Sequence, residues 1–198
     1  MLASLPSQLA KENKKFVYGV VRQGARAKDY ELAIQWLIDA GIIHKVSRVK
    51  EILSPVKFYE DPSAFKVFLL DCGLFGCMAD VPAREMLIGN NVFREFKGSF
   101  SEQFVLQQMV SMGLTAYYWS NDTSPAEIDF VVQTAERVIP IEVKAEENVR
   151  ARSMKTYIDN HPDARLKGLR LSMKGYVDQG WMENVPLYGM LKYAFVKG

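Results

Sequence analysis

The sequence predicts an α/β (α+β) protein, in which a small helical lobe precedes a larger lobe built around a mixed sheet. Three observations predict this class. A helical pattern covers residues 29–41, a helix is indicated over 99–113, and two alternating strand-like segments follow it within 127–144. With 198 residues, the chain is long enough to bury a sizeable core.

The first lobe is predicted to be winged-helix-like and to span residues 1–72. Asp29 can accept a hydrogen bond at the start of a helix, and Gly41 can end that helix. The apolar residues between them recur at helical spacing, which predicts one buried face. The other elements expected in this lobe are a short helix over 2–13 and two strands, over 42–46 and 65–70.

Residues 73–97 are predicted to connect the two lobes, and residues 98–198 to form the second. Lys97-Gly98 marks a break, after which Ser99 is expected to begin a helix that ends at Gly113. The order helix, three strands, helix, strand predicts a mixed sheet. The elements expected after the helix are strands over 116–119, 127–132, 138–144, 169–172 and 185–188, and a helix over 146–160.

The strands over 127–132 and 138–144 are the most informative part of the chain. Side chains alternate between the two faces of a strand. A hairpin with an even-numbered loop therefore places Asp129 opposite Glu142 and Lys144 opposite Glu127, whereas a shift by one residue would scramble both faces. The same register gathers apolar side chains on the other face, namely Ile128, Phe130, Val132, Ile139, Ile141 and Val143.

An Asp on one strand and a Glu-x-Lys on the next, after a helix that carries a Glu, is the layout of the PD-(D/E)XK nuclease core. Here Asp129 stands where that core has its Asp, and Glu142-Val143-Lys144 matches (D/E)-x-K. Glu102, Asp129 and Glu142 are therefore the predicted ligands of Mg²⁺ or Mn²⁺, since hard cations prefer carboxylate oxygens. Lys144 is the predicted catalytic residue, which would position or activate the attacking water.

These residues also have structural interpretations. Glu102 is the fourth residue of Ser99-Phe100-Ser101-Glu102, a capping-box pattern, and could act as a helix cap alone or could also face the metal. Lys144 could simply pair with Glu127 across the strands. Asp129 and Glu142 are harder to explain in this way, because facing carboxylates repel each other unless a cation or a base lies between them.

The charge distribution gives a weak indication of nucleic-acid binding. The net charge is +2, with 10 Lys and Arg against 6 Asp and Glu in residues 1–60, and 15 against 17 in the rest. Arg22, Arg26 and Lys28 could contact DNA phosphates, or could form a solvated face or a docking surface. The sequence has no long apolar run and no visible signal peptide, so a cytoplasmic location without a membrane partner is expected.

Seven segments of the chain occur in an order that is specific to one family. They are Arg26–Tyr30, Ala33–Ile43, Phe65–Val67, Asp71–Leu74, Gly98–Val105, Glu127–Phe130 and Ile139–Ala145. Together they resemble the C-terminal half of prokaryotic AAA+-type ATPases that carry the DUF4143 domain. The resemblance covers nearly the whole chain.

The resemblance implies an upstream ATPase core, followed by a winged-helix-like segment and a restriction-endonuclease-like domain. The sequence has no Gly-x-x-x-x-Gly-Lys-Ser/Thr motif, so ATP would bind only in a full-length protein. The chain is expected to be a C-terminal fragment whose partners are its own ATPase core and DNA. Its nuclease-like site would be a metal-dependent phosphodiesterase, or the fold would be an inactive module that binds nucleic acid or protein.

Overall fold

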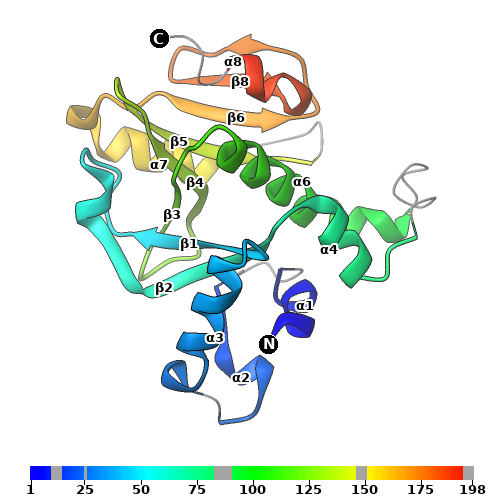
Figure 1. The fold of residues 1–198 in the computed structure, drawn as a ribbon. Helices are drawn as coiled ribbons and strands as arrows, with labels where there is room; N and C mark the ends of the chain where they lie inside the picture. The colour runs from blue at the N-terminus through cyan, green and yellow to red at the C-terminus, as the bar shows by residue number, and fades with distance from the viewer. Residues whose placement is uncertain (10–14, 25, 83–90, 146–150, 194–198) are drawn as a thin grey trace. The chain divides into compact units, whose positions relative to one another are not determined.

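The structure, a computed structural model, describes residues 1–9, 15–24, 26–82, 91–145 and 151–193. Within these residues, eight strands form one mixed sheet in the order β2-β1-β3-β4-β5-β6-β8-β7 (Figure 1), which confirms the predicted α+β class. The strands are β1 (Ile43–Val49), β2 (Glu60–Leu69), β3 (Ala116–Ser120), β4 (Glu127–Gln133), β5 (Val138–Val143), β6 (Gly168–Ser172), β7 (Val177–Asp178) and β8 (Met182–Pro186).

Helices precede and separate these strands. The α-helices are α1 (Leu5–Leu9), α2 (Tyr18–Val21), α3 (Ala27–Asp39), α4 (Cys72–Met78), α6 (Asn91–Ser111), α7 (Arg152–Asn160) and α8 (Met190–Tyr193). Short 3-10 turns occur at η1 (Leu2–Ser4), η2 (Val56–Tyr59), η3 (Pro162–Ala164) and η4 (Leu187–Gly189). None of the described helices combines the length and the apolar character that a membrane span requires.

The antiparallel hairpin lies between parallel pairs of strands. β1 runs parallel to β3, β3 and β4 are antiparallel, and so are β4 and β5. Beyond the hairpin, β5, β6 and β8 run parallel, and the short edge strand β7 returns antiparallel to β8. The carboxyl ends of parallel strands meet at the same edge of a sheet, where α/β proteins commonly place their sites.

The chain forms two compact units. Unit 1 consists of Met1–Val46 and Ser63–Phe104, and unit 2 consists of Ser47–Pro62 and Val105–Gly198. Three elements, β1, β2 and α6, contribute residues to both units. The predicted division at residues 72 and 97 remains a prediction.

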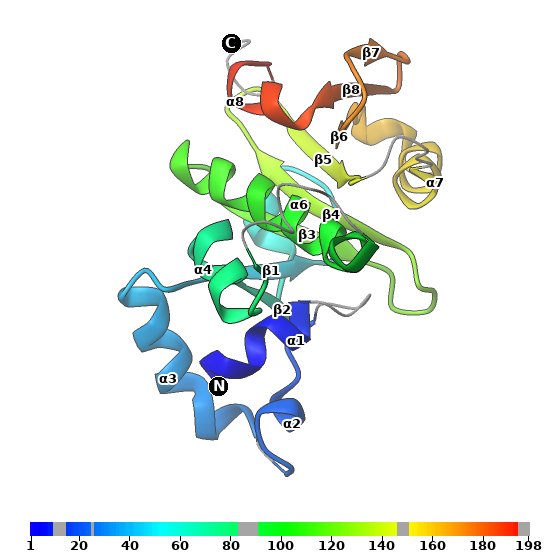
Figure 2. The same ribbon diagram turned by 90° about the vertical axis from the view of Figure 1, so that its right-hand side faces the viewer.

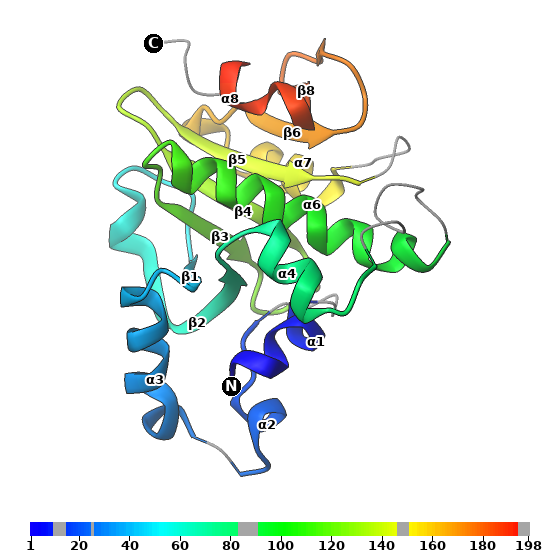
Figure 3. The same ribbon diagram turned by 45° about the vertical axis from the view of Figure 1, so that its right-hand side comes forward.

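In unit 1, helices α1 and α2 lie side by side (Figure 3). Phe16 stacks on Phe65 with ring centroids 5.6 Å apart, and Tyr18 contacts both rings edge-on. α3 begins at Ala27, two residues before the predicted cap. Asp29 lies inside the first turn and accepts a hydrogen bond from the Arg26 backbone N–H at 3.0 Å, so it still stabilises the helix start.

The helix predicted to begin at Ser99 begins at Asn91 instead. Gly98 lies inside this helix, because an isolated glycine weakens a helix without ending it. The Ser99 hydroxyl donates to the Leu9 carbonyl at 2.8 Å and therefore does not cap α6. The capping-box interpretation of Glu102 is thus wrong, since Glu102 lies well inside the helix.

Gln103, also in unit 1, is fully buried and bonds both backbone groups of one β2 residue. Its Nε2 donates to the Leu69 carbonyl at 2.7 Å, and its Oε1 accepts from the Leu69 N–H at 3.1 Å. A neighbouring strand makes the same pair of bonds. The Gln103 amide therefore substitutes for a strand at this point of β2.

In unit 2, the hairpin has the predicted register. Phe130 pairs with Ile141 and Val132 with Ile139, as an even-numbered loop requires. The predicted late elements also occur, with shifted ends. β8 ends at Pro186, because the chain turns into η4 there, and α7 begins at Arg152, while residues 146–150 of the predicted helix lie outside the described residues.

The core of unit 2 lies between the sheet and α7, which covers one face of β4, β5 and β6 (Figure 2). Tyr117, Tyr118 and Trp119 of β3 are buried. The predicted sorting of the hairpin faces is wrong at one residue. Ile128 packs in the same cluster as Val131, because β4 carries an irregularity at this point.

Candidate functional site

The irregularity in β4 determines how Asp129 is presented. Tyr117 of β3 pairs with Val131, but Trp119 pairs with Ile128, so two residues of β4 lie opposite one residue of β3. Such a bulge bends the strand and redirects a side chain, and bulges are frequent next to functional sites. The Asp129 carboxylate turns towards β5, where Oδ2 accepts a hydrogen bond from the Val143 N–H at 2.7 Å.

Glu142 and Lys144 form an ion pair at the end of β5. The Lys144 Nζ lies 2.5 Å from the Glu142 Oε1, and the two side chains are 33% and 8% exposed. The Lys144 backbone N–H donates to the Leu171 carbonyl at 2.9 Å, which attaches the end of this segment to β6. Asp129, Glu142 and Lys144 are therefore brought to one end of the hairpin.

A row of buried polar side chains continues from Glu142 across the next two strands. Glu142 is the register partner of Arg170 on β6, and Arg170 is the partner of Asn184 on β8. The Asn184 Oδ1 accepts from Arg170 Nε and from the Ser172 hydroxyl, both at 2.7 Å. All four side chains belong to residues that are at most 6% exposed. We call these four residues the polar row.

Asn184 anchors the polar row to the backbone. Its Nδ2 donates to the Lys174 carbonyl at 3.1 Å and to the Gly175 carbonyl at 2.7 Å. Both functional atoms of this amide are thus saturated, as a buried amide requires. The amide therefore fixes the Arg170 guanidinium next to Glu142.

The electrostatics of the site are balanced. Burial lowers the pKa of the Arg170 guanidinium, and the negative charge of Glu142 opposes this effect by raising it. Arginine keeps its charge in proteins even when buried. Glu142 therefore lies near two cations, Lys144 and Arg170.

Glu102, the third predicted ligand, is 8% exposed and lies in unit 1, whereas Asp129 and Glu142 lie in unit 2. Its role in a shared metal site remains a prediction. Among the residues that the structure describes, no group of three His, Cys, Asp or Glu side chains could hold a metal ion.

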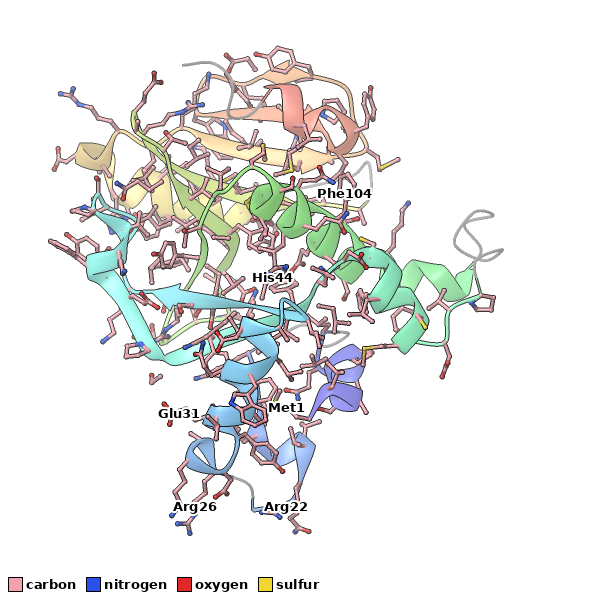
Figure 4. All side chains as sticks on the ribbon, viewed as in Figure 1. Met1, Arg22, Arg26, Glu31, His44 and Phe104 are labelled. Atoms are coloured by element: carbon pink, nitrogen blue, oxygen red, sulfur yellow. The ribbon has the colours of Figure 1, made fainter. Side chains whose placement is uncertain are left out.

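The predicted nucleic-acid-binding residues are all exposed in unit 1. Arg22 follows α2, Arg26 precedes α3, and Lys28 lies in the first turn of α3. Figure 4 shows Arg22 and Arg26 pointing into solvent from neighbouring parts of this unit. These positions are accessible to a large polyanion.

Arg170, Ser172 and Asn184 are site residues that the sequence did not predict. A weak signal existed, because Arg170 and Ser172 are polar residues that alternate with Leu169 and Leu171 in a predicted strand. Their connection to Glu142 depends on the pairing of β5 with β6 and of β6 with β8. Parallel pairing between distant segments leaves no local pattern that fixes its register.

Comparisons with known proteins add family information for two segments. No curated protein matches the chain. A solved structure, described as protein VC1899 from Vibrio cholerae, is 12% identical to this chain, with a TM-score of 0.28. The match covers 96% of this chain and 47% of the Vibrio cholerae protein, so this chain spans about half of that protein's length. Residues 1–85 match the domain of unknown function DUF8612. Residues 97–193 match the domain of unknown function DUF4143, which confirms the predicted resemblance for this part of the chain.

Proposed function

We propose that this chain is a DNA-associated C-terminal module of an AAA+-type ATPase, and that it carries a nuclease-like site for Mg²⁺ or Mn²⁺. The observation that carries this proposal is the arrangement at the end of the hairpin. Asp129 and Glu142 come from neighbouring antiparallel strands, and Lys144 pairs with Glu142 at 2.5 Å. These are the groups and the order of a PD-(D/E)XK site.

The donor set fits a hard divalent cation. Asp129 and Glu142 would hold it, because Mg²⁺ binds through one or two carboxylates and retains several waters. A bound cation would supply positive charge to a phosphodiester transition state. Lys144 would position the attacking water, and Arg170 would keep Glu142 oriented through the polar row. Glu102 remains a proposed additional ligand.

The ion pair between Lys144 and Glu142 competes with cation binding. Lys144 must release Glu142, at least in part, before the carboxylate can coordinate a cation. Removing the lysine charge should therefore strengthen cation binding while it abolishes cleavage. An isosteric loss of the Glu142 charge should weaken binding instead.

The test is calorimetric titration of Mg²⁺ and Mn²⁺ into the wild type, Glu142→Gln and Lys144→Met. Glu136→Gln is the matched control, because Glu136 is an exposed carboxylate in the turn between β4 and β5. We expect binding in the wild type and the control, tighter binding in Lys144→Met, and at least about 10-fold weaker binding in Glu142→Gln. Equal binding in all four proteins, or none, would contradict the metal site.

The charge balance favours a second candidate, a catalytically inactive module that binds nucleic acid. Two cations already lie near Glu142, so this buried carboxylate does not require a metal to balance its charge. DNA affinity measured against salt concentration tests this candidate. Arg26→Ala should lower the slope of log K against log salt by about 1, whereas Arg137→Ala, in the exposed turn of the hairpin, should leave the slope unchanged.

A further inference from the structure

Two adjoining hollows lie within unit 2. Their volumes are about 380 Å³ and 320 Å³, and they share Trp119, Asn121, Tyr157 and His161. Ligand sites of small molecules typically measure about 300–1,000 Å³. None of the described residues that line them belongs to the carboxylate face of the hairpin. We call the two hollows together the aromatic pocket.

The inner wall of the aromatic pocket is held rigidly. The Tyr157 hydroxyl accepts from the Ile52 N–H and donates to the Glu51 Oε2, both at 2.9 Å. Trp119 contacts the Tyr157 ring edge-on, with centroids 4.7 Å apart, and its Nε1 donates to the Lys50 carbonyl at 3.1 Å. Side chains fixed in this way preorganise a binding surface.

His161 and Glu51 present two acceptors to one gap. His161 stacks on Tyr157 with centroids 4.1 Å apart, and its Nδ1 lies 2.8 Å from the Tyr157 carbonyl. A carbonyl can only accept, so Nδ1 carries the proton. In the neutral ring, the lone pair of Nε2 then lies 3.7 Å from the Glu51 Oε2. This separation is too long for a direct hydrogen bond and too short to admit an atom on the line between them. An amino group beside that line can donate one hydrogen to each atom.

The rim of the aromatic pocket suits a phosphate. Lys50 and Arg152 are exposed at its edge. Arg48 also lines it, but its guanidinium is already paired with Asp61 and Asp122. The Asp122 carboxylate, which pairs with Arg48, also lines the pocket. The described lining also includes uncharged polar side chains, namely Ser120, Asn121, Ser124, Ser153, Thr156 and Asn160.

We propose that the aromatic pocket binds a nucleotide whose base carries an exocyclic amino group. The amino group donates into the gap between Glu51 and His161, and the phosphate lies against Lys50 or Arg152. Cytosine presents an amino donor where uracil presents a carbonyl acceptor. The pocket should therefore prefer cytosine, because the uracil oxygen would face two acceptors. The ligand is a free nucleotide or one nucleotide of a single strand.

The experiment compares CMP with UMP, and the cytidine pentanucleotide with the uridine pentanucleotide, by calorimetry. In the wild type we expect the cytosine ligand to bind at least about 10-fold more tightly, the value of one lost hydrogen bond of about 1.4 kcal/mol. Glu51→Ala should remove the preference, since it removes the Oε2 atom that faces His161 across the gap. His161→Gln is a second variant with the same expected loss, and Glu136→Gln, an exposed control, should keep the preference.

A preference shown by CMP itself would support the proposal with a free nucleotide as ligand. A preference shown only by the pentanucleotides would support it with a base of a single strand. Absence of binding by all four ligands, equal affinity for cytosine and uracil ligands, or a preference that survives in Glu51→Ala would overturn it. Since the pocket uses neither Asp129 nor Glu142, the metal titrations and these measurements can fail independently.

Discussion

Truncation of Asn184 should strongly lower the stability of unit 2. In Asn184→Ala the protein loses four hydrogen bonds of a fully buried amide, to Arg170, Ser172 and two backbone carbonyls. At about 1 kcal/mol each, the loss is about 4 kcal/mol. Domains are stable by only about 5–15 kcal/mol, so the variant should be close to unfolding.

The assay is urea denaturation of Asn184→Ala and of a matched control, Asn121→Ala. The Asn121 Oδ1 accepts from the Thr123 N–H and hydroxyl and from the Ser124 N–H, but this loop is exposed. Water can replace these bonds, so the control should lose at most about 1 kcal/mol. Equal losses in the two variants would refute the argument that burial gives the Asn184 bonds their value.

Ser172→Ala should cause a loss of stability between those of Asn121→Ala and Asn184→Ala. The hydroxyl donates to Asn184 and accepts from the Lys174 N–H at 3.2 Å, so the expected loss is about 1–2 kcal/mol. If Asn184→Ala is too unstable to measure, a larger loss of stability in Ser172→Ala than in Asn121→Ala would still show that burial strengthens these hydrogen bonds. A Ser172→Ala variant as stable as the wild type would contradict it.

Three further predictions concern Gln103, Tyr157 and Cys72. Gln103→Leu should destabilise the protein by about 2–3 kcal/mol in urea, because it leaves both backbone groups of Leu69 without their amide partner. Burial raises the pKa of the Tyr157 hydroxyl, so as the pH rises above about 10 the unfolded chain loses this proton first and the folded state loses stability. Tyr157→Phe should therefore reduce the alkaline loss of stability that thermal melts measure. At lower pH the same variant leaves the Ile52 N–H without its Tyr157 partner. Burial and the nearby Asp71 raise the pKa of Cys72 from 9.0 to about 11, so at pH 8 iodoacetamide should modify it roughly 100-fold more slowly than an ordinary thiol, as measured by mass spectrometry.

The hairpin could be predicted from the sequence because its information is local. Strict alternation and an even-numbered turn fix which residues of β4 face which residues of β5. The face on which Ile128 lies could not be predicted from local alternation, since a bulge depends on the neighbouring strand β3. Nor could the continuation of α6 through Gly98 be predicted, because the packing of a long helix overrides a single unfavourable residue.

The polar row and the aromatic pocket could not be predicted, because each gathers residues from distant segments. Glu142, Arg170 and Asn184 meet through the order of three parallel strands. Glu51 and Tyr157 are more than 100 positions apart and meet through a hydrogen bond. No periodicity in the sequence predicts contacts between such distant segments, whereas a local motif such as Glu-x-Lys fixes the spacing of its own residues.

The division of the fold between early and late residues limits how the chain can be cut. Unit 2 includes Ser47–Pro62, although the DUF4143 match begins only at residue 97. Within that early stretch, residues 47–49 pair with β3, and Ile52 and Val56 lie in the hydrophobic cluster around Trp119. A fragment that begins at residue 97 would leave β3 with a bare edge and an uncovered apolar wall, and both features promote aggregation. Workers who express the family domain alone should therefore expect insoluble material unless residues 47–62 are supplied, in cis or as a separate peptide.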